Sequence, residues 1–84
     1  MQKGFNTDIE FSGLSFHVQT EDWGSENPYL VSRVYQNGRV LKSLKIPYAD
    51  ILQPRQRESG QAVRLAMKIQ HQKILDLLVS GQLL

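Results

Sequence analysis

Apolar and polar residues alternate along the first part of the chain, on both sides of the dipeptide Ser12-Gly13. The apolar positions are Phe5, Ile9 and Phe11 before it and Leu14, Phe16 and Val18 after it. A two-residue turn at Ser12-Gly13 places all of these side chains on one face of a β-hairpin. The pattern therefore predicts a first hairpin with one apolar and one polar face, in which Asp8 lies opposite His17.

A second hairpin is predicted from Tyr29 to Ile46, after a loop that ends at Pro28. Asn37-Gly38 lies near its centre, and this dipeptide is typical of a type I′ turn because both central residues need positive φ. An uninterrupted register pairs Tyr35 with Val40, Arg33 with Lys42, Val31 with Leu44 and Tyr29 with Ile46 on one face. Both faces then carry apolar side chains, so we expect a helix to cover one face and a second subunit the other.

A long C-terminal helix is predicted over residues 60–80, which contain no proline and many good helix formers, with Gly81 as its stop. The face expected to lie on the sheet consists of Ala62, Val63, Ala66, Met67, Ile69, Ile74, Leu77 and Leu78, with His71 at its edge. Leu65, Leu75 and Val79 form a second apolar strip, which favours self-association. A helical turn at residues 48–52 and a polar segment at 53–60 connect the second hairpin to this helix.

Together these elements predict one α+β domain over residues 1–84. Its core is a four-stranded antiparallel sheet of two β-hairpins, followed by one long C-terminal α-helix packed on one face. A chain of 84 residues with 40% apolar and 21% charged residues has an ordinary globular composition. There is no cysteine, no N-terminal apolar segment and no run of 18 apolar residues, so we expect a cytoplasmic protein without disulfides or membrane contact.

Charge is distributed unevenly, although the net charge is only +2. Residues 1–27 contain five acidic side chains and a single base, Lys3, whereas residues 28–84 contain nine bases and three acids. Such asymmetry indicates complementary halves, either within one fold or between two copies of it.

Asp8 opposite His17 is the best candidate for acid–base chemistry, because a neighbouring carboxylate orients an imidazole. A hydrolase also needs an activated hydroxyl, and no G-x-S-x-G segment positions Ser15 or Ser32. The alternative is a solvated cross-strand pair, and we expect this alternative and no enzymatic activity.

Three acidic residues, Glu21, Asp22 and Glu26, fall in the loop between the hairpins and offer oxygen ligands for a hard cation. Their spacing does not match the twelve-residue calcium loop. We therefore predict no metal and no cofactor.

The predicted register places Arg33 directly opposite Lys42, which is destabilising unless negative charge lies nearby. Three sources are open: Asp8 or Glu10 of the first hairpin, an acidic partner protein, or a nucleic acid whose bases stack on tyrosines. The predicted partner-binding residues are Tyr29, Val31, Arg33, Tyr35 and Lys42 of the hairpin and Leu65, Leu75 and Val79 of the helix.

Several segments resemble a family of small bacterial proteins of uncharacterised function. They are Phe16-His-Val-Gln-Thr-Glu-Asp22, Asn27-Pro28, Leu30-Val-Ser-Arg-Val-Tyr35 with Gly38, and Gln70-His71 before Ile74-Leu-Asp-Leu-Leu78. The resemblance implies a bacterial, cytosolic protein and carries no activity, cofactor or ligand with it.

No motif in the sequence fixes an activity. We expect a non-enzymatic protein-interaction module that forms a homodimer, or another homo-oligomer, or binds a different protein. The alternative is a nucleic-acid-binding domain that uses Arg33, Lys42, Tyr29 and Tyr35.

Overall fold

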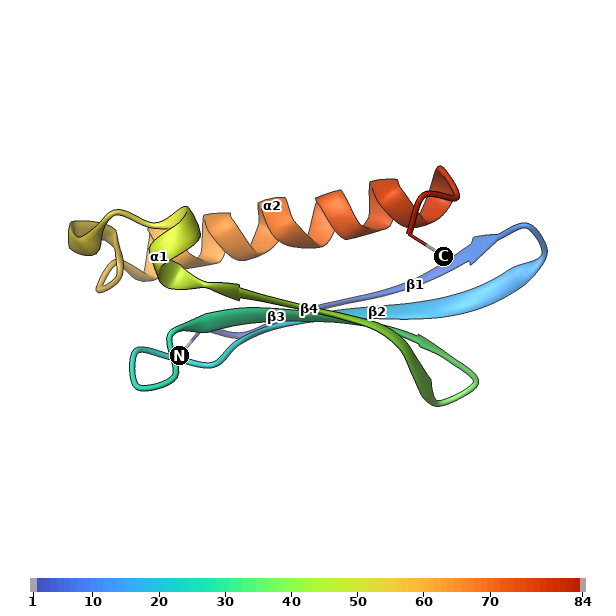
Figure 1. Ribbon diagram of the computed structural model, residues 1–84, viewed down its shortest axis with the longest axis horizontal. Coiled ribbons are helices and arrows are strands. Elements are labelled where there is room, and N and C mark those ends of the chain that lie inside the picture. Colours follow the sequence, from blue (N-terminus) through green and yellow to red (C-terminus); the bar gives the residue numbers. More distant parts are fainter. Residues whose placement is uncertain (1, 84) are drawn as a thin grey trace.

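A computed structural model describes residues 2–83 of the chain. Its elements are β1 (Phe5–Phe11), β2 (Leu14–Asp22), β3 (Tyr29–Gln36), β4 (Arg39–Pro47), α1 (Tyr48–Ile51), a 3₁₀ turn (Pro54–Gln56) and α2 (Gly60–Val79). The strands form one antiparallel sheet in the order β1-β2-β3-β4, and α2 runs along one of its faces (Figure 1). We call this the helix face and the other the open face. The predicted α+β fold is confirmed.

Both predicted turns are present. Ser12 and Gly13 have φ values of 53° and 76°, and Asn37 and Gly38 have 52° and 76°, which are the positive values that a type I′ turn requires. The register of the first hairpin is also as predicted, with Asp8 opposite His17.

The predicted register of the second hairpin is wrong beyond its turn. Tyr35 pairs with Val40 as expected, but the next pair is Val34 with Lys42, so Leu41 is an extra residue in β4. This β-bulge shifts every later residue of β4 by one position relative to β3. Arg33 consequently lies opposite Ser43, and no like-charged pair forms there.

The bulge also exchanges the faces of the later β4 residues, because side chains alternate along a strand. Leu44 lies opposite Ser32 and Ile46 opposite Leu30, on the helix face. The expected pairs of Leu44 with Val31 and Ile46 with Tyr29 are therefore wrong.

Helix α2 begins at the predicted Gly60 and ends at Val79, one residue before the predicted end. Ser59 caps its N-terminus, where the side-chain oxygen accepts a hydrogen bond from the backbone N–H of Ala62 at 3.2 Å. At its C-terminus Gly81 has a φ of 76°, and the N–H of Gln82 reaches back to the carbonyl of Leu77 at 3.0 Å. This is the left-handed glycine stop that the sequence indicates.

The face that α2 buries differs from the predicted one. The buried side chains are Val63, Met67, Gln70, His71, Ile74 and Leu78. Ile69, expected on this face, is 62% exposed, and Ala62, Ala66 and Leu77 are only half-buried. Two polar residues thus take the place of an aliphatic one, because the sheet below supplies hydroxyl groups that bind them.

A hydrogen-bonded polar layer crosses the core between α2 and the sheet. The two ring nitrogens of His71 each lie 2.8 Å from a threonine hydroxyl, Nε2 from Thr7 and Nδ1 from Thr20. The hydroxyl of Thr20 contacts that of Ser32 at 2.7 Å, and the amide of Gln70 donates to Ser32 at 2.9 Å. Since each buried polar side chain of this layer has a partner, burial costs little here.

The polar layer separates two apolar clusters. One consists of Phe16, Val18, Val34, Ile74 and Leu78, and the other of Leu30, Tyr48, Leu52, Val63 and Met67. The first lies under the C-terminal half of α2 and the second under its N-terminal half and α1. Both clusters lie on the helix face, so the core of the domain is on one side of the sheet.

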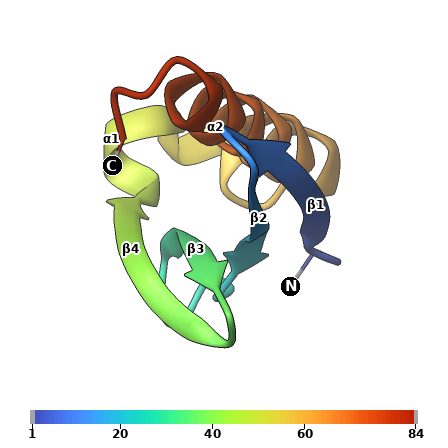
Figure 2. The same cartoon turned by 90° about the vertical axis from the view of Figure 1, so that its right-hand side faces the viewer.

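Helix α2 packs mainly on β2, with β1 and β3 on either side. Viewed end-on, the sheet is strongly curved, with β1 at one edge and β4 at the other, where the chain continues into α1 (Figure 2). Residues 39–45 of β4 are all exposed. Among the described residues, no helix is long and apolar enough to cross a membrane.

Candidate interaction surface

An apolar groove of about 270 Å³ runs between β4 and the two helices. Its lining residues are Leu44 and Ile46 of β4, Ile51 of α1, and Ala66, Ile69, Gln70 and Lys73 of α2. Ile69 is 62% exposed, Ile51 41% and Leu44 38%. Large aliphatic side chains gathered at an exposed surface are typical of a contact site.

The groove follows a strand with an open edge. In the part of the chain that the structure describes, strand β4 pairs only with β3, so one side of its backbone has no partner strand there. Such an edge is a template for a further strand. The groove and the edge together, which we call the β4 surface, are positioned by the bulge at Leu41, because it turns Leu44 and Ile46 toward α2.

The two edge strands carry opposite charge. Strand β1 exposes Asp8 and Glu10, and β4 exposes Arg39, Lys42 and Lys45. Within residues 2–83, the one lysine or arginine paired with a carboxylate is Arg33, with Glu21 at 3.3 Å. The acidic and basic edges are therefore not neutralised by each other inside the fold.

The structure brings together only part of the predicted partner-binding residues. Tyr29, Arg33 and Tyr35 share the open face, where Val31 is buried and only 3% exposed. Lys42 lies on the helix face because of the bulge, so its predicted place beside Arg33 is wrong.

The predicted helix strip is also only partly correct. Leu65 and Val79 are exposed at 58% and 44%, but Leu75 is half-buried and packs against the cluster around Phe16. The exposed helix residue that lines the groove is Ile69 instead.

Cations and aromatic rings cluster at one end of the open face. The ammonium of Lys45 lies 4.2 Å from the ring centre of Tyr29 and 5.0 Å from that of Trp23. The guanidinium of Arg33 lies 5.9 Å from the Trp23 ring and donates to Glu21. The negative charge expected beside Arg33 is thus supplied by Glu21 and not by Asp8 or Glu10.

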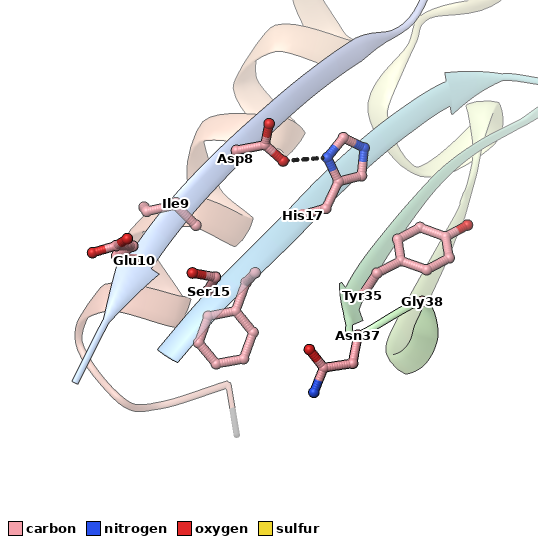
Figure 3. Close-up of a pocket in the computed structure, with 9 residues that line it drawn as sticks. Asp8, Ile9, Glu10, Ser15, His17, Tyr35, Asn37 and Gly38 are labelled. Carbon is pink, nitrogen blue, oxygen red and sulfur yellow. Dashed lines mark hydrogen bonds and ion pairs between the residues drawn. The ribbon is translucent and has the colours of Figure 1, made fainter. Parts of the chain in front are cut away.

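The Asp8 and His17 pair lies in an open hollow at the other end of this face (Figure 3). The Nδ1 of His17 is 2.8 Å from Asp8 Oδ1, and its Nε2 is 3.2 Å from Asn6 Oδ1. Both ring nitrogens are therefore occupied, and neither is free to take a proton from the Ser15 hydroxyl. Because the side chain of Asp8 is 90% exposed, the pair is a solvated cross-strand contact.

The three acids expected in the loop do not converge, and that placement is wrong for two of them: Glu21 and Asp22 belong to β2, on opposite faces of the sheet, and Glu26 alone lies in the loop. Asp22 is 5% exposed on the helix face and accepts hydrogen bonds from the Gln2 and Gly24 N–H groups, at 2.8 and 2.9 Å, and from the Tyr48 hydroxyl. Burial raises the pKa of Tyr48 well above its ordinary value, and the hydrogen bond to Asp22 adds to this. Within residues 2–83, no three histidine or acidic side chains are grouped as metal ligands.

The β4 surface was not recognised from the sequence, because Leu44 and Ile46 were assigned to the open face and Ile69 to the core. The sequence does carry a signal for the polar layer, because Thr20 and Ser32 fall on otherwise apolar faces and so indicate that polar helix residues lie above them.

Comparison of the chain with models of known protein families, with curated proteins and with solved structures found no match.

Proposed function

We propose that this domain is a protein-interaction module without catalytic activity of its own, and that it associates with further copies of itself through the β4 surface. The observation that carries the proposal is the exposure of Leu44, Ile51 and Ile69 in one groove beside an open strand edge. A second copy of the chain is the simplest partner that can cover these side chains.

The free energy gained by burying the groove side chains indicates how much of the contact they can account for. Fully burying a leucine or isoleucine is worth about 1.5–3 kcal/mol, and these side chains are already partly buried, so each contributes on the order of 1 kcal/mol. Association costs at least about 4 kcal/mol of lost freedom. The groove alone supports only weak binding, and backbone pairing along the β4 edge supplies the remainder.

Sedimentation velocity at several protein concentrations tests the proposal. We expect the parent protein to associate in the micromolar range and Ile69→Glu to weaken this association by about tenfold or more, because a carboxylate in the groove loses its hydration. Gln61→Glu is the matched control, since it adds the same charge at an exposed helix position outside the groove. A parent protein that stays monomeric at high micromolar concentration overturns the proposal.

Nucleic-acid binding is the weaker candidate. Tyr29, Tyr35 and Arg33 do share the open face, but Glu21 pairs with Arg33, and Asp8 and Glu10 add negative charge to the same face. Binding of a single-stranded oligonucleotide with a steep, linear dependence of log affinity on log salt would favour this candidate instead.

A further inference from the structure

We infer that the strand which pairs with the β4 edge is β1 of a second copy, so that successive copies join into one continuous antiparallel sheet. This inference rests on the proposed self-association and adds which two segments meet.

Charge selects β1 over a second β4. Two β4 edges side by side would join two strands that each carry Arg39, Lys42 and Lys45 and no acidic residue, and like charges on neighbouring strands are destabilising. Edge lysines protect many proteins from this kind of pairing. The acidic β1 edge offers the opposite charge: within residues 2–83, Asp8 pairs with His17, and neither Asp8 nor Glu10 pairs with a lysine or arginine.

Strand direction fits as well. The four strands alternate in direction, so β1 and β4 of one domain run in opposite senses. Two copies placed side by side in the same orientation therefore present β4 and the neighbouring β1 as antiparallel strands. Both α2 helices then lie on the same face of the joined sheet.

The hairpin turns define which backbone groups are available. In an antiparallel pair every second residue is hydrogen bonded across the ladder, and the residues flanking a two-residue turn form one such pair. The outward-directed groups of β1 consequently belong to Asn6, Asp8 and Glu10, and those of β4 after the bulge to Ser43 and Lys45.

One register satisfies both charge and burial. Placing Lys45 opposite Asp8 of the second copy also places Ser43 opposite Glu10 and Leu44 opposite Ile9. Lys45 and Asp8 both lie on the open face, and Leu44 and Ile9 both lie on the helix face. The half-exposed Leu44 thereby gains an apolar neighbour at the mouth of the groove.

This contact joins two different edges and is not self-complementary. The copy at one end of the assembly keeps a free β1 edge and the copy at the other end keeps a free β4 edge. Further copies can therefore add to a dimer until a ring closes. A self-complementary contact stops at two copies.

Mixing two edge-blocked variants tests the inference. Glu10→Pro blocks the β1 edge and Ser43→Pro the β4 edge, because each removes an outward-directed N–H. We expect each variant alone to be monomeric by sedimentation, and an equimolar mixture to form dimers and nothing larger. Glu10→Gln and Ser43→Thr keep the N–H, so each should still assemble on its own, in contrast to the proline variant at the same position.

The outcomes separate the two proposals. If Glu10→Pro alone associates as the parent does, β1 is not the second strand and the inference fails, while self-association stands. If the parent itself is monomeric, the proposed function fails first. Should a proline variant lose its circular dichroism spectrum, the charge variants Asp8→Lys and Lys45→Asp replace it: each should weaken assembly, and the double variant should restore it.

Discussion

At the scale of single residues, the most informative side chain is His71. It lies 6% exposed in the middle of the core, with one threonine hydroxyl on each ring nitrogen. A charged imidazole would have to lose its hydration there, and accordingly burial, with a smaller effect of the charge of His17, lowers the pKa of His71 from its ordinary value of 6.5. Its function in the fold is to link α2 to β1 and β2.

The stability of the domain should therefore fall in mild acid. Below pH 6.5 the unfolded chain protonates His71 while the folded chain does not, so the unfolded state binds more protons and the free energy of unfolding decreases as the pH falls from 6.5 toward the lowered folded pKa. Urea denaturation at about pH 7 and pH 5 measures this. The loss between the two values should be smaller in His71→Gln than in the parent, and an equal loss in both proteins contradicts the assignment.

A second residue-scale prediction concerns the buried hydroxyl of Tyr48, which donates to the carboxylate of Asp22. Tyr48→Phe leaves that carboxylate with two donors instead of three and should lower the free energy of unfolding by about 1–3 kcal/mol. Tyr35→Phe is the control, because its hydroxyl belongs to the open face. Chemical denaturation that gives equal stabilities for the two variants would argue against a structural role for the Tyr48 hydroxyl.

At the scale of elements, the strands and the two α-helices were predictable from the sequence. Which β4 side chains lie on which face of the sheet was not predictable. Alternation, two turn dipeptides and a proline-free segment define the elements by local chemistry. A bulge has no comparable local signal in Val40-Leu41-Lys42, and it depends on which of two registers packs better against α2. The misassigned β4 residues and the misplaced Lys42 both follow from this one extra residue.

The bulge gives a deletion experiment. Removing Leu41 restores regular pairing without changing the face of Leu44 or Ile46, because the residues after it keep their partners on β3. We expect this variant to fold, with a change in stability of about 1 kcal/mol. Removing Gln19 from β2, which has no bulge to absorb the change, should flip one end of the strand and unfold the domain; thermal melts of the two variants decide the matter.

At the scale of the whole molecule, the sequence correctly indicated two halves of opposite charge but left open whether they meet within one fold. The structure answers this in part, since Glu21 of β2 and Arg33 of β3 meet while the acids of β1 and the bases of β4 lie at opposite edges of the sheet. The candidate surface could not be predicted, because it depends on how far α2 extends over the sheet. That distance is a property of the packed domain and not of any segment.

This separation of charge predicts that assembly depends on salt. Attraction between exposed charges is screened over about 10 Å at 0.1 M salt and over about 3 Å at 1 M, whereas contacts between apolar side chains are not weakened in this way. If Lys45 meets Asp8 of a second copy, the dissociation constant should rise several-fold between about 0.05 M and 0.5 M sodium chloride, and Lys45→Gln should remove most of that rise. A dissociation constant that does not change with salt would mean that the groove residues Leu44, Ile51 and Ile69 hold the copies together without help from the edge charges.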